Sequence, residues 1–513
     1  MSTKNVFNSP ASRRAFLRQA AGFAGLGAAA PMALNLAALG SANAQTTGDY
    51  KALVCVFLFG GNDAFNMVLP TDAASWSAYS QVRNQAPESI ALLAPGTAPQ
   101  MGAGAGSPER LGGVLPISPI SNQGRTFGLH PCMTGVRDLF AAGRLAVLPN
   151  IGPLVRPSTK ADLKIASFAR PAGLYSHNDQ QSTWQSLTPE GATVGWGGRF
   201  ADLLMAGNTQ PIFSAISAGG NAVFLSGQQA LQYQISTRGA IRIGGTDTSL
   251  FGSTTAFDRM RNVMRGGRNS DVIGRDHAAV VSRSLTAEAL IASAMPAVNV
   301  APYGTPGLAN GAADPLLQYD NPLTGGKSNN NLAQQLQVVA RTMGARSALG
   351  AGRQVFFVSM GGFDTHDGQN RAQADLMAKL SHALAYFDNT LSAMGLRNNV
   401  TTFTASDFGR TFTSNGDGTD HGWGSHHFVM GGAVKGREFY GNFPVVGVKN
   451  SKNNDFDSSP NQLGNGSLLP ETSVEQLGAT LGRWMGVSEG QLADIFPNLK
   501  NFDASKRDLG FMA

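Results

Sequence analysis

The stretch ALVCVFLF, residues 52–59, is a continuous apolar run that contains β-branched and aromatic residues and is stopped by Gly60 and Gly61. A run of this length without polar alternation is typical of a strand that is buried on both faces, as in parallel sheets. It therefore predicts a central strand of an α/β fold.

Helix-like and strand-like segments alternate in the second half of the chain. We expect a helix over 332–349, a strand over 355–359, a helix over 374–394 and a strand over 400–404, with a further helix near 473–485. Such alternation is typical of parallel strands joined by helical crossovers. We predict an α/β fold with a doubly wound, mostly parallel sheet over residues 45–513. Residues 210–330, which are broken by Gly, Pro and Ser, are expected to form an insertion or cap.

Composition excludes several classes of protein. The chain has 513 residues, of which 42% are apolar and 14% charged, and it contains only 2 cysteines. Apolar content at this level argues against a disordered or collagen-like chain, and two cysteines cannot form a disulfide framework. No basic patch interleaved with aromatic residues is visible, so a nucleic acid partner is not expected.

The first 44 residues have the features of a signal peptide. They carry four basic residues and no acidic one, so they account for +4 of the formal charge of +6. Paired Arg13 and Arg14 in SRRAFLR, residues 12–18, match a twin-arginine signal, and small residues precede a cleavage site near Ala44. Pro31 interrupts the apolar stretch, so no stable membrane anchor is expected. We predict export by the twin-arginine translocase to the periplasm or medium.

Polar motifs follow three of the expected strands. FLFGGNDAFN, VSMGGFDTHDGQ and FTASDFGRT place acidic, imidazole and guanidinium groups at these strand ends: Asp63, Asp364, His366, Asp407 and Arg410. Two further motifs, GTDHGWGSHHF and LYSHNDQQSTW, add other candidates: Asp420, His421, His426, His427, Ser176, His177, Asn178 and Asp179. Ligands of open α/β sheets bind beyond the carboxyl ends of the strands, so these groups are expected to converge.

Carboxylates with neutral imidazoles form the ligand set of zinc, manganese and similar divalent ions. Two such ions about 4 Å apart are a common device for hydrolysing phosphoesters. Each motif alone is weak evidence, because a single such His is more often a turn or cap residue than a ligand, and an Asp after Gly-Asn can simply form an Asx-turn. The joint pattern favours a divalent metal, in one or two sites.

The motifs together resemble a bacterial family of twin-arginine-exported proteins of unknown function, grouped with the alkaline phosphatase and sulfatase superfamily. The resemblance covers nearly all of the mature chain and is carried by the leader and by LFGGNDAFN, GLHP, SHND with Trp184, GGFDTH, SDFGRT, GTDHG with GGAVKG, and ATLGRWMGV with IFPNL. It implies a doubly wound sheet with a metal site, usually of two ions, at the strand ends.

The resemblance also implies roles for individual residues. Asp63 matches the first-strand aspartate, and Asp407 matches an aspartate normally followed by histidine, although Phe408 stands in that place here. Asp364 and His366 match a pair normally separated by three residues rather than one, and His421 matches a late histidine, with His426 and His427 as competitors. Ser176 best matches the nucleophile, with Ser182 and Thr183 as alternatives.

Two functions follow as hypotheses. The first is an exported metal-dependent hydrolase of phosphate or sulfate esters. Its metal ligands would be Asp63, Asp364, His366, Asp407 and His421, and Ser176 would attack or ligate. Arg410 would stabilise the transferring anion or simply pair with Asp407. The second is a catalytically inactive binding or assembly protein on the same fold, which recognises an anionic small molecule, a glycan or a protein.

Overall fold

The core of the protein is a nine-stranded sheet with the strand order β16-β5-β15-β12-β1-β11-β6-β7-β8. The computed structural model describes residues 50–241, 249–250, 252–264, 272–309, 313–452 and 455–513. The predicted signal peptide lies outside the described residues. The sheet strands are β1 (Lys51–Leu58), β5 (Leu145–Gly152), β6 (Ala215–Ser217), β7 (Tyr233–Ser236), β8 (Gly239–Ala240), β11 (Arg353–Met360), β12 (Val400–Ser406), β15 (Ser425–Met430) and β16 (Thr472–Ser473).

The sheet is mostly parallel, as predicted. Strand β1 pairs in parallel with both β11 and β12, and β11 pairs in parallel with β6. Of the nine strands, all but β8 and β15 run in the same direction. In the register, Leu58 at the end of β1 lies opposite Met360 of β11 and Ser406 of β12. The three strands therefore end level, and the loops after them start side by side.

Successive side chains of β1 point into two different cores. Val54 and Val56 belong to the core on one face of the sheet, whereas Leu53 and Phe57 belong to the core on the other. Because side chains of a strand alternate between the two faces, a strand covered on both sides must be apolar throughout. This is the physical reason for the unbroken apolar run at 52–59.

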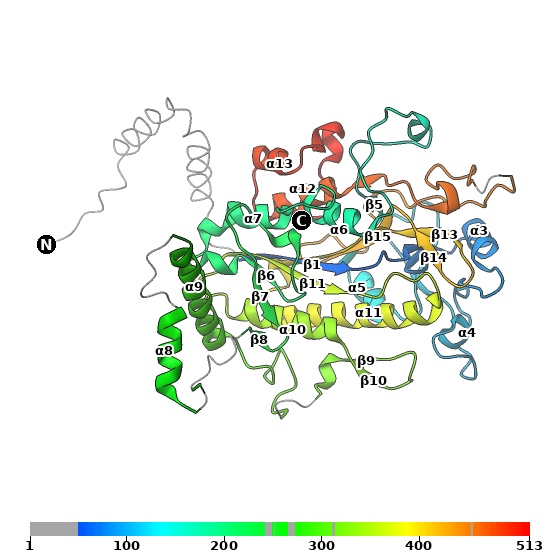
Figure 1. The fold of residues 1–513 in the computed structure, drawn as a ribbon. Coiled ribbons are helices and arrows are strands. Elements are labelled where there is room, and N and C mark those ends of the chain that lie inside the picture. The colour runs from blue at the N-terminus through cyan, green and yellow to red at the C-terminus, as the bar shows by residue number, and fades with distance from the viewer. Residues whose placement is uncertain (1–49, 242–248, 251, 265–271, 310–312, 453–454) are drawn as a thin grey trace.

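Helices cover both faces of the sheet, as Figure 1 shows. One layer contains α5 (Thr134–Ala141), α10 (Asn331–Gly344) and α11 (Gln369–Ala393), and the other contains α6 (His177–Ser186), α7 (Trp196–Leu204), α12 (Val474–Met485) and α13 (Glu489–Ile495). Two further helices, α3 (Ala73–Arg83) and α4 (Pro108–Leu111), lie beyond the strand ends in Figure 1. Within the described part of the chain, no helix is both long and apolar enough to span a bilayer.

Residues 210–330, expected as an insertion or cap, take part in the main sheet as well. Strand β6 pairs with β11, and β7 and β8 continue the sheet to its edge. The remainder carries α8 (Thr254–Met264), α9 (Val272–Ala294), β9 (Gln318–Asp320) and β10 (Lys327–Asn329) outside the sheet. This segment, rich in Gly, Pro and Ser, therefore adds strands to the central sheet and also carries helices and a strand pair outside it.

Besides the pair β9 and β10, two small sheets lie outside the central one. Strands β2 (Val68–Pro70), β3 (Leu115–Ile117) and β4 (Phe127–Leu129) form one of them. The other is the pair β13 (Arg410–Ser414) and β14 (Thr419–His421), in which Arg410 lies opposite His421. This pairing folds the histidine of GTDHG back onto the loop that follows β12.

Candidate metal centre

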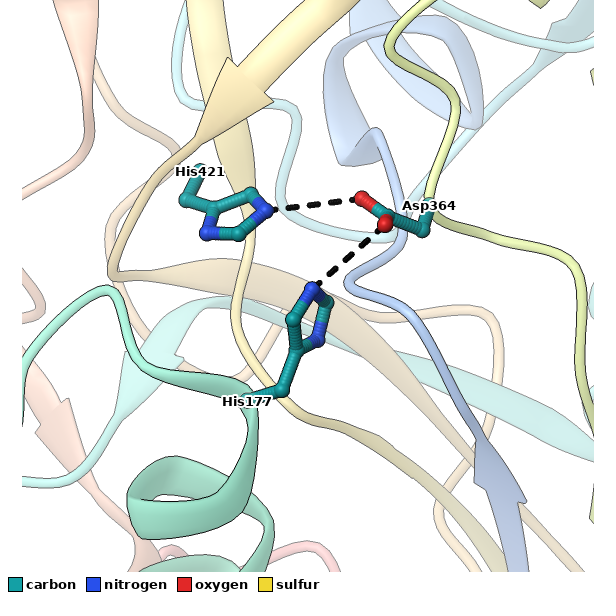
Figure 2. A group of neighbouring side chains, drawn as sticks. All are labelled: His177, Asp364 and His421. Carbon is teal, nitrogen blue, oxygen red and sulfur yellow. Dashed lines mark ion pairs between the residues drawn. The ribbon is translucent and has the colours of Figure 1, made fainter.

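Asp364, in the loop after β11, lies at the centre of a group of three histidines. Its Oδ1 atom is 3.1 Å from Nε2 of His366 and 3.4 Å from Nε2 of His421, and its Oδ2 atom is 3.5 Å from Nε2 of His177. Figure 2 shows His177 and His421 pointing at this carboxylate from two different segments. The Asp364 side chain is 44% exposed, so the group is open to solvent.

The other ring nitrogen of each histidine faces an acceptor. Nδ1 of His177 lies 2.7 Å from Oδ2 of Asp407, and Nδ1 of His421 lies 2.8 Å from the carbonyl oxygen of Tyr175. Nδ1 of His366 lies 3.3 Å from Oδ1 of Asp420. A neutral ring that donates from Nδ1 to such an oxygen keeps a lone pair on Nε2, and the Nδ1 contacts of His177 and His421 favour this tautomer.

This arrangement fits a divalent cation. Histidines that bind metals almost always donate their second N–H to a carboxylate or a backbone carbonyl. The Nε2 atoms of His366 and His421 are only 2.9 Å apart, and two lone pairs at this distance repel unless a cation or a proton lies between them. Zinc binds imidazole and carboxylate ligands at about 2.0–2.2 Å in a tetrahedron, which spaces the ligand atoms about 3.4 Å apart.

Local structure explains how the three histidines reach one point. His177 is the first residue of α6, and Ser176 caps this helix by accepting a hydrogen bond from the backbone of Asp179. His421 ends β14, opposite Arg410. Gly418 allows this hairpin to approach the chain at His366, because a Cβ atom at residue 418 would collide with the His366 backbone. The sheet therefore supplies Asp364, while a helix and a hairpin bring His177 and His421 to it.

Asp407, expected as a metal ligand, contacts the far side of the His177 ring. Its Oδ2 atom accepts hydrogen bonds from His177, from Nε2 of Gln181 at 2.8 Å and from the backbone of Gly60 at 3.1 Å. Burial raises the pKa of this carboxyl, although these hydrogen bonds oppose the rise. In the structure Oδ2 of Asp407 therefore orients His177, and the role of Asp407 as a metal ligand stays a prediction.

Asp63 does not join the group either. Its Oδ2 atom lies 2.7 Å from Nη1 of Arg83 and 2.5 Å from Nε2 of Gln369, and its Oδ1 atom accepts from the backbone of Phe65. The side chains of Asp63 and Arg83 are buried. Asp63 is therefore paired with an internal arginine in the structure, and its role as a metal ligand stays a prediction.

Arg410 is also placed differently from either expectation. Nη1 donates to Oδ1 of Asp364 at 2.9 Å and to the carbonyl of Gly60 at 3.0 Å, while Nε and Nη2 donate to Thr419. The side chain has 0% exposure, so it cannot contact a substrate anion, and its carboxylate partner is Asp364 rather than Asp407. Burial opposes ionisation of Asp364, but the hydrogen bond and charge of Arg410 outweigh it and lower the pKa of that carboxyl.

The competitors of His421 lie elsewhere. His426 and His427 are fully buried on β15, and burial lowers the pKa of each to about 3. Nδ1 of His426 accepts from the backbone of Asn150, and Nδ1 of His427 contacts the Thr404 hydroxyl. They are core residues, and His421 is the member of this motif that reaches the centre.

Sequence reasoning missed two residues of this group. His177 was noticed in SHND but was not expected as a ligand, and the Tyr175 carbonyl that orients His421 carries no side-chain signal. Phe408 packs against both outer imidazoles, with ring centroids 4.8 Å from His177 and 4.6 Å from His421. The signal that could have found His177 is its place in SHND, between a serine and a following acid, as in the other histidine-acid motifs.

Several solved structures are distantly similar to this chain. A crystal structure of Ps i-CgsB has 10% sequence identity and a TM-score of 0.32, over 89% of this chain and 77% of that one. A Bacteroides thetaiotaomicron protein, described under the metabolism of multiple glycosaminoglycans, has 9% identity and a TM-score of 0.31, over 87% and 74%. A mutant of the alkaline phosphatase PafA has 13% identity and a TM-score of 0.24, over 72% and 64%.

No curated protein matches the chain at a significant level. Residues 50–496 match the family described as Protein of unknown function (DUF1501). This match spans all the described motifs of the site and confirms the expectation of a family of unknown function. The chain therefore belongs to the DUF1501 family.

Proposed function

We propose that the protein is an exported metal-dependent hydrolase of phosphate or sulfate esters. The observation that carries the proposal is the convergence of three imidazole Nε2 atoms on the solvent-exposed carboxylate of Asp364. His177, Asp364, His366 and His421 would hold the ion, and zinc or manganese suits this donor set. A divalent ion bound there would supply Lewis acidity and charge stabilisation to an ester oxygen.

The protein's own residues would position the ion and the substrate. Asp407 and Tyr175 hold the rings of His177 and His421 in the required orientation. Ser176 directly precedes His177 at the start of α6, and we propose its hydroxyl as the nucleophile or as a further ligand. An anionic group that approached this hydroxyl would also meet the positive end of the α6 dipole.

Export is part of the same proposal and rests on the leader. Replacing both arginines of the pair, Arg13→Lys with Arg14→Lys, is expected to keep the protein in the cytoplasm of a host with a twin-arginine translocase. Cell fractionation and immunoblotting measure the distribution. Unchanged export of the double variant would contradict this route.

The alternative is a catalytically inactive binding or assembly protein with the same centre. Two observations favour it: Phe408 replaces an expected imidazole, and Arg410 is buried and cannot clamp a substrate anion. A protein of this kind would bind a metal and yet hydrolyse neither ester.

The test is to purify the protein with its leader processed, measure bound metal, and assay p-nitrophenyl phosphate and p-nitrophenyl sulfate with zinc and with manganese. His177→Asn and His421→Asn are expected to lose metal and activity together. His277→Asn, an exposed histidine on α9, is the matched control and should change neither. Metal-loaded protein that hydrolyses neither ester would favour the alternative, and protein that takes up no metal would defeat both.

A further inference from the structure

We infer that this centre is built for one divalent ion, and that the buried guanidinium groups of Arg83 and Arg410 supply the positive charge that a second ion would otherwise bring. The inference rests on the proposed metal centre. It concerns Asp63 and Asp407, the two carboxylates that the family resemblance assigns to metal binding but that the structure leaves outside the histidine group.

Asp63 is already fully engaged. Both of its oxygens accept hydrogen bonds, and the guanidinium of Arg83 lies 2.7 Å from Oδ2. Arg83 in turn donates to Asn66 and to the backbone carbonyls of Thr411 and Phe412, and its side chain has 0% exposure. Since Oδ1 accepts from the backbone of Phe65 and Oδ2 from both Arg83 and Gln369, Asp63 has no oxygen free for a cation.

Arg410 lies beside Asp364 but contacts only its Oδ1 atom, which leaves Oδ2 facing His177. Its guanidinium contacts Oδ1 of Asp364 and is held from behind by Thr419. The Thr419 hydroxyl donates to Oε1 of Gln369, whose amide donates to Asp63. A continuous chain of hydrogen bonds thus runs from Asp364 through Arg410, Thr419 and Gln369 to Asp63. The carboxylate at one end contacts Arg410, and the carboxylate at the other end contacts Arg83.

The space beyond the end of β1 is filled as well. A Cβ atom at Gly61 would collide with the Phe408 ring, and a Cβ atom at Gly60 would collide with the backbone of Asp364. Both glycines have positive φ, +115° at Gly60 and +83° at Gly61. No ligand side chain can therefore stand at these two positions, and Phe408 offers no donor atom where a histidine would.

One oxygen remains to be explained. Oδ1 of Asp407 is buried without a hydrogen-bond partner. A single carboxylate oxygen does not make a site, since zinc and manganese need at least three protein ligands to be held firmly. Among the described residues, His177, Asp364 and His421 form the one group of three or more such ligand atoms that lie within 4.8 Å of one another.

The experiment is metal counting on the full-length processed protein. It is stripped with a chelator, dialysed against zinc or cobalt, desalted and analysed by mass spectrometry, and crystals of the zinc-loaded protein are measured at the zinc edge. We expect one equivalent of metal and one anomalous peak, beside Asp364. Asp63→Asn should keep the one equivalent, whereas His421→Asn should bind at least tenfold more weakly.

Two equivalents, or a second anomalous peak beside Asp63 or Asp407, would overturn the inference. The crystal measurement uses the unmodified chain, so it decides the question even if Asp63→Asn fails to fold. The outcome is separate from the proposed function. One ion without esterase activity supports the inference and removes the function, whereas two ions with activity do the reverse, and no bound metal refutes both.

Discussion

Asp407→Asn tests whether the carboxylate behind His177 strengthens metal binding. In the protein, Oδ2 of Asp407 accepts from Nδ1 of His177 at 2.7 Å. An asparagine oxygen in the place of Oδ2 can still accept from Nδ1 of His177, so the ring keeps its tautomer. The substitution removes the negative charge behind this ring.

The size of the effect follows from the hydrogen bond. A hydrogen bond to a charged group contributes about 1.5–3 kcal/mol, and a neutral one roughly half as much. The imidazole bound to a cation therefore loses about 1–2 kcal/mol of support, which is about a 5- to 30-fold weaker affinity. This agrees with the usual cost of removing an outer-shell partner of a metal ligand, about 10- to 100-fold.

The assay is competition for zinc or cobalt against a chromophoric chelator, combined with denaturant unfolding of the metal-free protein. The metal-free variant is expected to be less stable than the parent by about 1–3 kcal/mol, because the asparagine Nδ2 group takes the place of Oδ1, which is buried without a hydrogen-bond partner. Glu475→Gln, which alters another buried carboxyl outside the histidine group, should leave metal affinity unchanged. If Asp407→Asn binds metal as tightly as the parent, His177 is not a ligand supported by Asp407.

Three further predictions concern stability. Burial raises the pKa of Glu475 from 4.5 to about 7, so ionisation costs the folded state about 3 kcal/mol, a penalty that is absent below pH 4.5 and complete above pH 7. The difference in unfolding free energy between Glu475→Gln and the parent should therefore rise by about this amount between pH 4.5 and 7, and a constant difference would contradict it. Gly61→Ala, which drives a methyl group into the Phe408 ring at positive φ, should cost at least about 2–3 kcal/mol in urea unfolding. Gly143→Ala, also at positive φ but with no neighbour within 4 Å, is its control and should cost about 1 kcal/mol; equal costs would refute the collision. Arg83→Met leaves Asp63 buried and unpaired, so calorimetry should show about 3–5 kcal/mol of destabilisation, and a near-neutral result would show that Asp63 is not held as an ion.

The fold class could be predicted from the sequence because the apolar pattern that indicates it lies within single strands and helices. Burial between two helical layers requires apolar residues on both faces of β1, and the chain shows this directly at 52–59. Strands β11 and β12 and helices α10, α11 and α12 were predicted from the same kind of pattern, with ends that differ by a few residues. Strand β15 was missed, because its buried polar residues His426 and His427 resemble a ligand motif rather than a strand.

Only some of the site residues could be predicted from the sequence. Asp364, His366 and His421 were predicted and meet in the structure. Asp63 and Asp407 follow strand ends in the same way and are engaged elsewhere. The pattern of the motif is the same in both cases, so the partner of each carboxylate could not be read from its own neighbours in the chain.

The sequence by itself therefore determined the α/β class, the positions of the central strands, and the set of polar groups that could lie at their carboxyl ends. Only the tertiary structure decided which of these groups face one another. His177 meets Asp407 across 230 residues of chain, and Arg83 reaches Asp63 from the end of α3. Periodicity arises within one element, whereas the pairing of charges depends on how separate elements pack, and this packing assigns one carboxylate to the centre and another to an internal arginine.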